Sequence, residues 1–376
     1  MVERHRTVES LGVTIPSALP DPAFWRGRRV LLTGHTGFKG AWAALWLERL
    51  GAVVTGFALA PETTPSLYAL AAPWAGQNSV IGDVRDREAL HAAVSDADPE
   101  IVIHMAAQAL VRRGYAEPRA TFETNVQGTA NLLDALDGCR HLDAVLVVTT
   151  DKCYRNDNNG RAFTETDPLG GADPYSASKA AQELVCHAWP GALPLVTARA
   201  GNVVGGGDWA ADRVLPDLFR AVAAGVAIRL RQPRATRPWQ HVLDVLSGYF
   251  LYAERLATAP GGLPSALNFG PPPHAGHIRD VGWLVEAATA CLRAHGIDVE
   301  NWLQDGKPGP AEAATLALDP ALAASTLGWR TRLDAAESVS WTAEWHARLQ
   351  RGEAARSIAG DQIERYTAGK LSARVA

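Results

Sequence analysis

A tyrosine and a lysine stand four residues apart at Tyr175 and Lys179. On a helix, residues with this spacing share one face, so the ammonium group lies near the phenol. A neighbouring positive charge lowers the pKa of a phenol from about 10 toward neutrality, and the phenolate can then take a proton from a substrate hydroxyl. An exposed helix carries the same spacing without any chemistry, so the meaning of the pair depends on the motifs around it.

A second group of reactive side chains follows the apolar run Ala144–Val148, where Thr150, Asp151 and Lys152 stand in sequence. The threonine hydroxyl can share a substrate alcohol with Tyr175. A carboxyl and an amine side by side can donate one proton and remove another, which fits the elimination of a leaving hydroxyl. The alternative interpretation is an exposed turn in which the two charges pair.

A glycine-rich segment lies between the apolar run Val30–Leu32 and the helical stretch Ala41–Leu50. Glycines spaced by three permit a tight turn, and the N–H groups at the start of the following helix can then bind a pyrophosphate. A glycine-rich turn that binds nothing is the alternative, but the strand before it and the helix after it favour a dinucleotide site. The residues expected to hold the cofactor here are Gly34, His35, Thr36, Gly37, Phe38, Lys39 and Gly40.

Two further apolar runs end in residues that suit a dinucleotide. An acid after Val80–Ile81 can reach the adenine, and small residues after Ile101–His104 leave room for a ribose and a diphosphate. The run Val53–Phe57 is not followed by the acid that usually binds the ribose 2′-hydroxyl, so NAD is favoured over NADP without being decided. The cofactor residues expected outside the glycine turn are Asp83, Val84, Ala106, Ala107, Gln108, Tyr175 and Lys179.

Regular elements must bring these motifs together. Short apolar runs, the last at Leu195–Ala198, alternate with helical stretches such as Gly40–Leu50 and Arg87–Val94. This alternation predicts an α/β fold with a Rossmann-type, doubly wound parallel sheet, whose ligands bind at the carboxyl ends of the strands. After Gly201 the rhythm loosens, which indicates a smaller α/β C-terminal lobe that binds substrate through long loops.

The expected organisation has four parts. Residues 1–22 form an N-terminal arm, and residues 23–200 with about 242–267 form the cofactor domain. Residues 201–241 and 268–350 form the substrate-binding lobe, and residues 360–376 form a polar, loosely held tail.

Bulk composition excludes several classes of protein. The 376 residues carry a formal net charge of −4, which does not attract nucleic acid or an anionic membrane over long distances. The chain has no apolar stretch of about 18 residues and no secretory leader, and its four cysteines lack CxxC spacing. We therefore expect a cytoplasmic enzyme without a metal site.

The motifs together resemble the CDP-glucose 4,6-dehydratases, a family of the extended short-chain dehydrogenase/reductase superfamily. The similarity covers about residues 24–345. Its most specific feature is the pair Asp151-Lys152, because the related dTDP-glucose and GDP-mannose dehydratases have a glutamate where Lys152 stands. Further matching segments are Phe24-Trp25, Gly34–Gly40, Leu110–Arg113, Thr124–Val126, Asp151–Tyr154, Asp173–Ser176, Ala198–Asn202, Gly205–Trp209, Arg237–His241, Asn268–Gly270 and Leu327–Trp329.

The resemblance implies an internal redox cycle with NAD. Tyr175, helped by Thr150 and Lys179, would take the proton of the sugar 4-hydroxyl while hydride leaves C4. The resulting ketone makes the C5 proton acidic. Lys152 in its neutral form would remove that proton while Asp151 protonates the departing C6 hydroxyl, and hydride would return to C6.

The resemblance also implies a binding site for a nucleotide sugar, with a CDP-hexose favoured, and a homodimer or a dimer of dimers. The dimer would pack helices at about residues 116–136 and 175–189. Arginine suits a diphosphate because its planar guanidinium forms two parallel hydrogen bonds. The substrate residues expected are Arg112, Asn202, Arg213, Arg237, Gln240 and Glu312.

Two segments depart from the family pattern, namely Arg155–Phe163 and Ala311-Glu312, where the family usually has His-Glu. These departures leave the sugar and the nucleotide open. The competing readings are a dehydratase for another nucleotide sugar, a 4-epimerase of the same superfamily, and a catalytically idle NAD(H)-binding sensor. The last is disfavoured because Thr150, Asp151, Tyr175 and Lys179 are all present.

Overall fold

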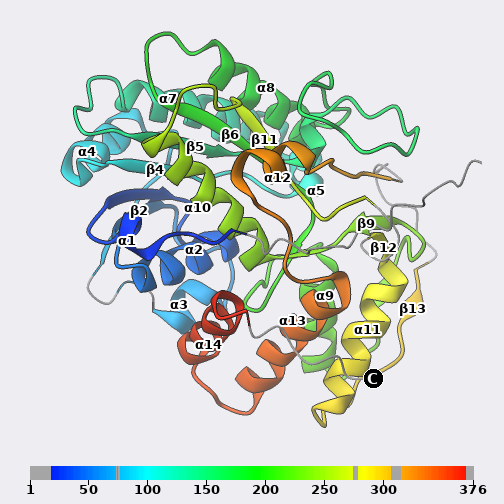
Figure 1. The fold of residues 1–376 in the computed structure, drawn as a ribbon. Coiled ribbons are helices and arrows are strands. Elements are labelled where there is room, and N and C mark those ends of the chain that lie inside the picture. Colours follow the sequence, from blue (N-terminus) through cyan, green and yellow to red (C-terminus); the bar gives the residue numbers. More distant parts are fainter. Residues whose placement is uncertain (1–17, 73, 75–76, 274–277, 306–314, 370–376) are drawn as a thin grey trace, which may run out of the picture.

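The centre of the molecule is a seven-stranded parallel sheet with the strand order β11-β6-β5-β4-β1-β2-β3 (Figure 1). The computed structural model describes residues 18–72, 74, 77–273, 278–305 and 315–369. Its strands are β1 (Arg29–Thr33), β2 (Val53–Ala58), β3 (Asn78–Ile81), β4 (Ile101–His104), β5 (Ala144–Val148), β6 (Leu195–Ala200) and β11 (Ala266–Phe269). This arrangement confirms the predicted fold class.

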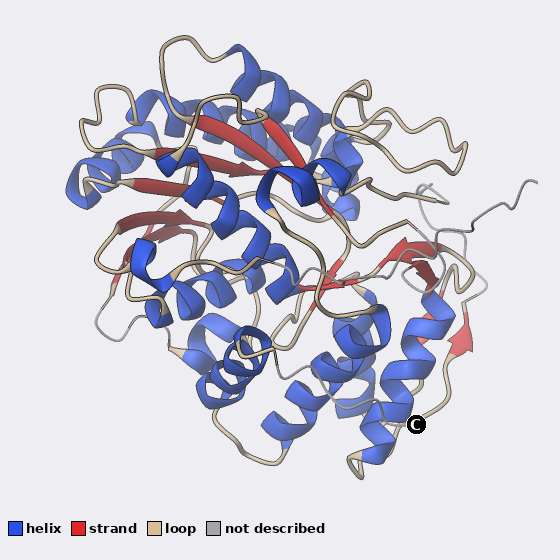
Figure 2. Cartoon of the chain, in the orientation of Figure 1, coloured by secondary structure: helices blue, strands red, loops and turns tan. Residues whose placement is uncertain are grey.

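Helices cover both faces of the sheet (Figure 2). On one face, Val30 and Leu32 join the large core that includes residues of α2 and α10. On the other face, Leu31 and Val102 pack with α4, α7 and α8. Successive side chains of a strand point to opposite faces, so a strand that is apolar throughout is buried on both sides. The helices are α2 (Phe38–Arg49), α10 (Val242–Thr258), α4 (Arg87–Ala97), α7 (Gly128–Ala135) and α8 (Pro174–Ala188).

A smaller lobe holds a separate apolar core, to which Leu218, Leu284 and Val339 contribute. Its helices are α9 (Val214–Ala223), α11 (Val281–Ala294) and α13 (Ala335–Gln350). Its strands, which pair as β10-β7, β12-β9 and β13-β8, are β7 (Val203–Val204), β8 (Arg229–Leu230), β9 (Thr236–Pro238), β10 (Gln240–His241), β12 (Ile278–Asp280) and β13 (Leu303–Gln304).

The remaining elements are short helices, apart from the last. They are α1 (Pro22–Trp25), α3 (Leu67–Ala71), α5 (Val111–Ala116), α6 (Pro118–Phe122), the π-helix η1 (Glu123–Gln127), the 3₁₀-helix η2 (Asp151–Cys153), α12 (Ala321–Leu327) and α14 (Ala355–Thr367).

The C-terminal expectation is wrong for residues 360–367. These residues belong to α14, which packs against α2, α3 and α13 and buries Ile363 and Tyr366. The Tyr366 hydroxyl donates a hydrogen bond of 2.8 Å to the Asp244 carboxylate. A polar composition hid an amphipathic helix, because only one of its faces is apolar.

The described part of the N-terminal arm is anchored. The Ala18 amide donates to the Gly328 carbonyl at 3.0 Å, and Leu19 packs against the large core. The Asp21 side chain caps α1. Residues 1–17 of the expected arm lie outside the described residues.

The direction of winding reverses between β1 and β4, which are hydrogen-bonded neighbours although β2 and β3 separate them in sequence. In open parallel sheets, ligands bind outside the carboxyl ends of the strands at such a reversal. The residues that directly follow β1, β4 and β5 therefore meet at one edge of the sheet.

Candidate active site

Two pockets adjoin at the carboxyl edge of the sheet. The first, of about 300 Å³, is lined by the glycine turn after β1 and by residues after β2, β3 and β4; we call it the cofactor pocket. The second, of about 320 Å³, is lined by the residues after β5 and by the smaller lobe; we call it the substrate pocket. The residues that line both are Lys39, Ala109, Leu110, Asp208 and Arg213.

The glycine turn is shaped to bring a ligand close to the backbone. A Cβ on Gly34 would lie 2.6 Å from the Ala106 nitrogen, and one on Gly40 would lie 2.2 Å from the Gly34 carbonyl oxygen. Both glycines are thus required by contacts of the turn with the protein itself. Gly37, the N-cap of α2, lines the cofactor pocket. A Cβ on Gly37 would meet only the Gly34 carbonyl oxygen, at 3.4 Å. The start of α2 therefore presents free N–H groups to that pocket, which suits a diphosphate.

His35 occupies the turn, but its side chain points away from the cofactor pocket. The imidazole is buried, contacts Ser79 Oγ through Nε2 at 2.8 Å and lies edge-on to Trp74 at 4.5 Å. Burial lowers the pKa of His35 to about 4, so the ring is neutral. A Cβ on Gly56 would lie 2.5 Å from this ring, which explains a small residue near the end of β2.

Most of the other expected cofactor residues reach the pocket wall, but Tyr175 and Lys179 do not line it. Thr36, Phe38, Val84, Ala106, Ala107 and Gln108 all line the cofactor pocket. Asp83 also lines it, but its carboxylate accepts three hydrogen bonds of 2.6–3.1 Å from the Arg85 side chain, which lower the Asp83 pKa. Arg113 lies at the same pocket in a 2.6 Å ion pair with Glu62.

The strand β5 leads to Thr150, Asp151 and Lys152 on the wall of the substrate pocket, where Thr150 is the N-cap of the short helix η2 and the other two belong to it. Thr150 Oγ1 donates to Asp151 Oδ1 at 3.0 Å. Asp151 Oδ2 is buried and has no hydrogen-bond partner among the described residues. Burial raises the pKa of Asp151, although Lys152, Thr150 and Arg237 oppose that shift. A carboxyl in such a place can hold a proton for donation.

Tyr175 lines the substrate pocket, and Lys179 is buried one turn further along α8. The Asp173 side chain caps this helix by accepting from the Ser176 amide at 3.0 Å, and Pro174 begins it. Burial raises the pKa of Tyr175 to about 12, with a hydrogen bond to Thr150 opposing. The net shift is therefore opposite to the expected one, because desolvation of the phenol outweighs the nearby positive charges.

Of the expected substrate residues, Arg112, Asn202, Arg213 and Arg237 line the substrate pocket. Gln240 does not, since its buried Nε2 donates to the Phe269 carbonyl at 3.0 Å. Glu312 lies outside the described residues. The arginines are partly paired with acids of the pocket, as Arg213 Nη1 lies 3.4 Å from Asp208 Oδ2.

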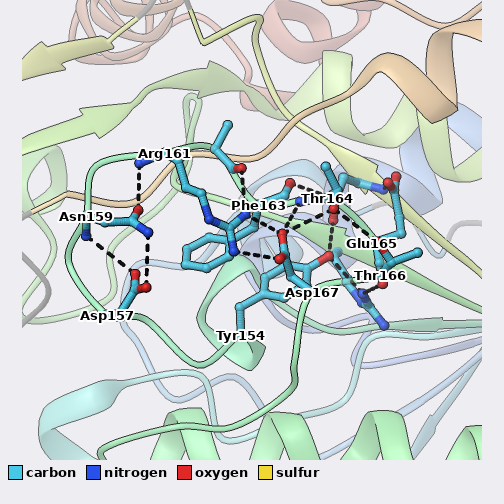
Figure 3. A network of polar contacts seen from close by, with 12 residues as sticks. Tyr154, Asp157, Asn159, Arg161, Phe163, Thr164, Glu165, Thr166 and Asp167 are labelled. Carbon is cyan, nitrogen blue, oxygen red and sulfur yellow. Dashed lines mark hydrogen bonds and ion pairs between the residues drawn. The ribbon is translucent and has the colours of Figure 1, made fainter.

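The segment that departs from the family pattern forms a loop with many polar contacts (Figure 3), and Phe163 ties it to Ala317 and Asn268 through hydrogen bonds of its backbone. Arg161 forms two hydrogen bonds of 2.6 and 2.7 Å with Asp167, and the Asp167 carboxylate also accepts from the Thr164 amide. The Phe163 ring stacks on Tyr154 with centroids 5.0 Å apart. None of residues 155–167 lines either pocket. The departures in this loop therefore leave the pocket walls unchanged.

Several polar residues of the site were missed from the sequence. Asp208 lies between the two pockets, and Asp212 bridges Arg112 and Arg231 at 3.0 and 3.5 Å. A signal for Asp208 was present in the three glycines before it. Gly206 packs so closely that a Cβ would lie 2.0 Å from Trp345, so the turn has a fixed course.

Lys39 adds a cation between the pockets. Burial and the neighbouring Arg213 lower its pKa to about 8, while Asp151 and Asp208 oppose the shift. The residue expected to bind only the cofactor therefore also faces the carboxyl of the substrate pocket.

Comparison with known proteins agrees with this geometry. The model of the NAD dependent epimerase/dehydratase family matches residues 30–268. A CDP-glucose 4,6-dehydratase of Salmonella typhimurium is 41% identical over 344 residues, which cover 89% of this chain and 94% of that protein. A dTDP-glucose 4,6-dehydratase of Xanthomonas campestris is 27% identical and covers 84% of this chain and 92% of that protein.

A solved structure of a related dehydratase has a similar fold. The dTDP-glucose 4,6-dehydratase of Streptomyces venezuelae, solved with NAD bound, has a TM-score of 0.71 and 26% identity, and covers 86% of this chain and 98% of that one. The chain belongs to the NAD dependent epimerase/dehydratase family, and the resemblance to the CDP-glucose 4,6-dehydratases is confirmed. The family assignment also confirms NAD as the expected cofactor. No helix in the described ranges is long and apolar enough to cross a membrane.

Proposed function

We propose that this protein is an NAD-dependent nucleotide-sugar 4,6-dehydratase that converts CDP-glucose into CDP-4-keto-6-deoxyglucose and water. The observation that carries the proposal is the buried Asp151, next to Lys152 and on the same pocket wall as Tyr175. Hydride transfer alone needs the tyrosine and a hydroxyl. A carboxyl with a raised pKa beside an amine adds what the loss of a hydroxyl requires.

The residues present fit a dinucleotide. The N–H groups at the start of α2, the gap in front of Gly37 and the cation of Lys39 would hold its diphosphate, and the small residues Ala106 and Ala107 would border its ribose. When bound, NAD supplies the hydride acceptor and donor for the sugar carbons. The protein supplies the proton transfers.

The first transfer belongs to Tyr175. Its phenol shares the pocket wall with Thr150, and the two hydroxyls would bind the sugar 4-hydroxyl together. Tyr175 takes the proton of that hydroxyl as C4 becomes a ketone. Because burial raises its pKa, the phenol needs nearby positive charge to release and recover the proton. Arg213 opposes the rise, and the buried Lys179 stands one turn further along α8.

The second transfer uses the neighbouring pair. Lys152 takes the proton from C5, which the C4 ketone has made acidic, and Asp151 gives a proton to the C6 hydroxyl, which departs as water. The open Oδ2 of Asp151 carries that proton, since Oδ1 is already bonded to Thr150. Lys152 then gives its proton back to C5 as hydride reaches C6. The product keeps its 4-ketone, so Tyr175 must release the proton that it took and Asp151 must regain one before the next turnover.

Side-chain cations of the substrate pocket would bind the nucleotide diphosphate. Arg112, Arg213 and Arg237 come from three different segments of the pocket wall. Paired hydrogen bonds from arginine suit phosphate oxygens, and the acids Asp208 and Asp212 keep these guanidinium groups in place.

The test is product analysis with CDP-, dTDP-, GDP- and UDP-glucose and NAD. Mass spectrometry should find loss of water with CDP-glucose, whereas the absence of any water-loss product would contradict the proposal. In Asp151→Asn, NADH should still form on the enzyme while release of the 4-keto-6-deoxy sugar falls by roughly 10²–10⁴. Asp143→Asn is the matched control. It makes the same change at the opposite end of β5, at an aspartate that lines neither pocket.

A 4-epimerase is the second candidate, favoured by the shared sheet and tyrosine. The UDP-glucose 4-epimerase of Thermotoga maritima has a TM-score of 0.72 at 20% identity and shares the fold. An epimerase releases the 4-epimer without loss of water, and its rate does not depend on an acid at the position of Asp151. The same mass spectra therefore separate the two candidates.

We also propose a homodimer that packs α5, α6 and α8 against a second copy. Three large apolar side chains on these helices are exposed, namely Tyr115 at 44%, Phe122 at 40% and Leu184 at 56%. Such residues on neighbouring helices mark a self-association surface. Light scattering should give twice the chain mass, and Leu184→Glu should give a monomer; a monomeric wild type would contradict the dimer.

A cytoplasmic location is part of the same proposal. All four cysteines are free in the structure, which fits a reducing compartment.

A further inference from the structure

A buried chain of hydrogen bonds begins at Lys179 and runs away from the substrate pocket. Lys179 Nζ donates to the Val148 carbonyl at 3.1 Å and to Gln182 Oε1 at 2.8 Å. Gln182 Nε2 donates to Thr129 Oγ1 at 2.7 Å, and the same oxygen lies 3.0 Å from His104 Nε2. The other ring nitrogen, Nδ1, lies 2.7 Å from Thr33 Oγ1, at the end of β1.

The protons of this chain can be placed without ambiguity. Thr129 Oγ1 donates its only proton to the Asn125 carbonyl at 2.8 Å, so it must accept from both Gln182 and His104. His104 therefore carries its proton on Nε2, and its Nδ1 accepts the proton of Thr33. The oxygen of Thr33 in turn accepts from two backbone amides, of Met105 and Ala106, at 3.2 Å each.

This pattern fixes the orientation of the Gln182 amide. If the amide were reversed, its NH₂ group would face the Lys179 ammonium and its oxygen would face a hydroxyl that has no proton left to give. Both contacts would be lost in a buried place, where an unpaired polar group is costly. Gln182 therefore always presents an acceptor to Lys179, and two of the three N–H donors of Lys179 are engaged away from the substrate pocket.

We propose that Gln182, Thr129 and His104 are positioning residues that hold Lys179 in its charged form and in one orientation, and that join it through Thr33 to the turn that binds the cofactor. The inference rests on the proposed function, because it takes the Lys179 ammonium to support proton transfer by Tyr175. It assigns a role to three residues of α7, α8 and β4 that line neither pocket.

The charge of Lys179 depends on such support. Burial, together with the Lys39 cation, lowers its pKa to about 7. Glu183 and Cys186 on α8, and Cys153 on η2, act in the opposite direction. His104 adds no charge, since burial lowers its pKa to about 3. With an ammonium so near its titration point, the acceptor oxygens of Gln182 and Val148 decide how much of it stays charged.

Two opposite substitutions at one position test the inference. Gln182→Leu removes an acceptor from the charged form, so the pKa of Lys179 falls and the alkaline limb of the kcat profile moves to lower pH by roughly one unit. Gln182→Glu places a carboxylate beside the ammonium, so the same limb moves to higher pH. At pH 8 the leucine variant should lose about 10-fold in kcat, with little change in KM.

Further variants separate positioning from a general loss of stability. Gln362→Leu makes the same change at a buried glutamine of α14, whose Nε2 donates to the Trp341 carbonyl at 2.8 Å, and should keep the wild-type profile. If Gln182→Glu does not fold, Thr129→Val replaces it, because loss of that hydroxyl releases the Gln182 amide and should shift the limb downward.

The outcomes are distinguishable. A wild type that does not turn over CDP-glucose defeats the proposed function. A wild type that does, with Gln182 and Thr129 variants that keep its alkaline limb, overturns the positioning chain. A shift in Gln362→Leu as large as that in Gln182→Leu overturns it as well.

Discussion

The cofactor pocket and the substrate pocket share an edge but are built in different ways. The cofactor pocket is formed by the turns that directly follow β1 to β4, and close contacts between backbone atoms give it its shape. The substrate pocket takes Arg112 from α5, Arg213 from the start of α9 and Arg237 from β9, and these side chains give it its charge.

The difference predicts how each pocket responds to substitution. A site made by backbone depends on the absence of side chains and tolerates few additions. A site made by long side chains depends on single groups, and the loss of one leaves the others able to bind. Tyr175 lies on the wall of the substrate pocket and Lys179 is buried behind it. Because Tyr175 is proposed to move a proton of the substrate, its loss should affect the reaction more than either binding step.

The largest effect is expected at Tyr175. In Tyr175→Phe, no hydroxyl remains to take the sugar proton, so formation of enzyme-bound NADH in a single turnover should slow by roughly 10²–10⁴, with NAD affinity retained. Tyr252→Phe is a suitable control, since the Tyr252 hydroxyl donates to the Pro264 carbonyl and lines neither pocket. Near-normal NADH formation in Tyr175→Phe would remove the tyrosine from the mechanism.

The next effect concerns the cofactor pocket. Gly37→Val should fold, because the backbone of Gly37 is extended and a Cβ there meets only one atom at 3.4 Å, but its side chain occupies the space in front of the amides. NAD affinity measured by calorimetry should fall by about 10²-fold, or ~2.7 kcal/mol. Gly40→Ala provides the contrast, as its Cβ would lie 2.2 Å from the Gly34 oxygen and should lower the melting temperature. Unchanged NAD affinity in a folded Gly37→Val would show that this turn does not bind the cofactor.

The same contrast explains what could be predicted from the sequence. The glycine turn and its flanking elements span 21 consecutive residues in the chain, Arg29 to Arg49, so spacing alone was sufficient to locate them. The strand ends after β4 and β5 followed from the parallel sheet. The pairing of Asp212 with Arg112 and Arg231 joins residues up to 100 positions apart, and no local pattern contains it.

Electrostatics was the part that spacing predicted wrongly. The four-residue spacing of Tyr175 and Lys179 correctly placed both on one face of α8, yet burial raises the phenol pKa instead of lowering it. The direction of a pKa shift depends on the balance of desolvation and charge, which only the folded surroundings determine. The partners of Lys179 on β5 and within α8 were equally invisible, because Gln182 is an ordinary helical residue in sequence.

The smallest of the three effects belongs to the substrate pocket. Arg237 is buried, donates to its neighbour Thr236 at 2.8 Å and lowers the pKa of Asp151. A charged hydrogen bond to a phosphate contributes about 1.5–3 kcal/mol, so Arg237→Gln should raise KM for CDP-glucose roughly 10- to 100-fold. The pKa of Asp151 should rise further in this variant, so its proton is retained and kcat should change little at neutral pH.

Two further variants sharpen this prediction. Arg237→Lys keeps the charge without the planar guanidinium, so its KM should lie between those of the wild type and Arg237→Gln. Arg87→Gln is the control, because Arg87 lies on α4 and lines neither pocket. If steady-state kinetics instead show a collapse of kcat with unchanged KM, Arg237 acts on the reacting sugar and the division between a charge-built binding pocket and a separate catalytic wall is wrong.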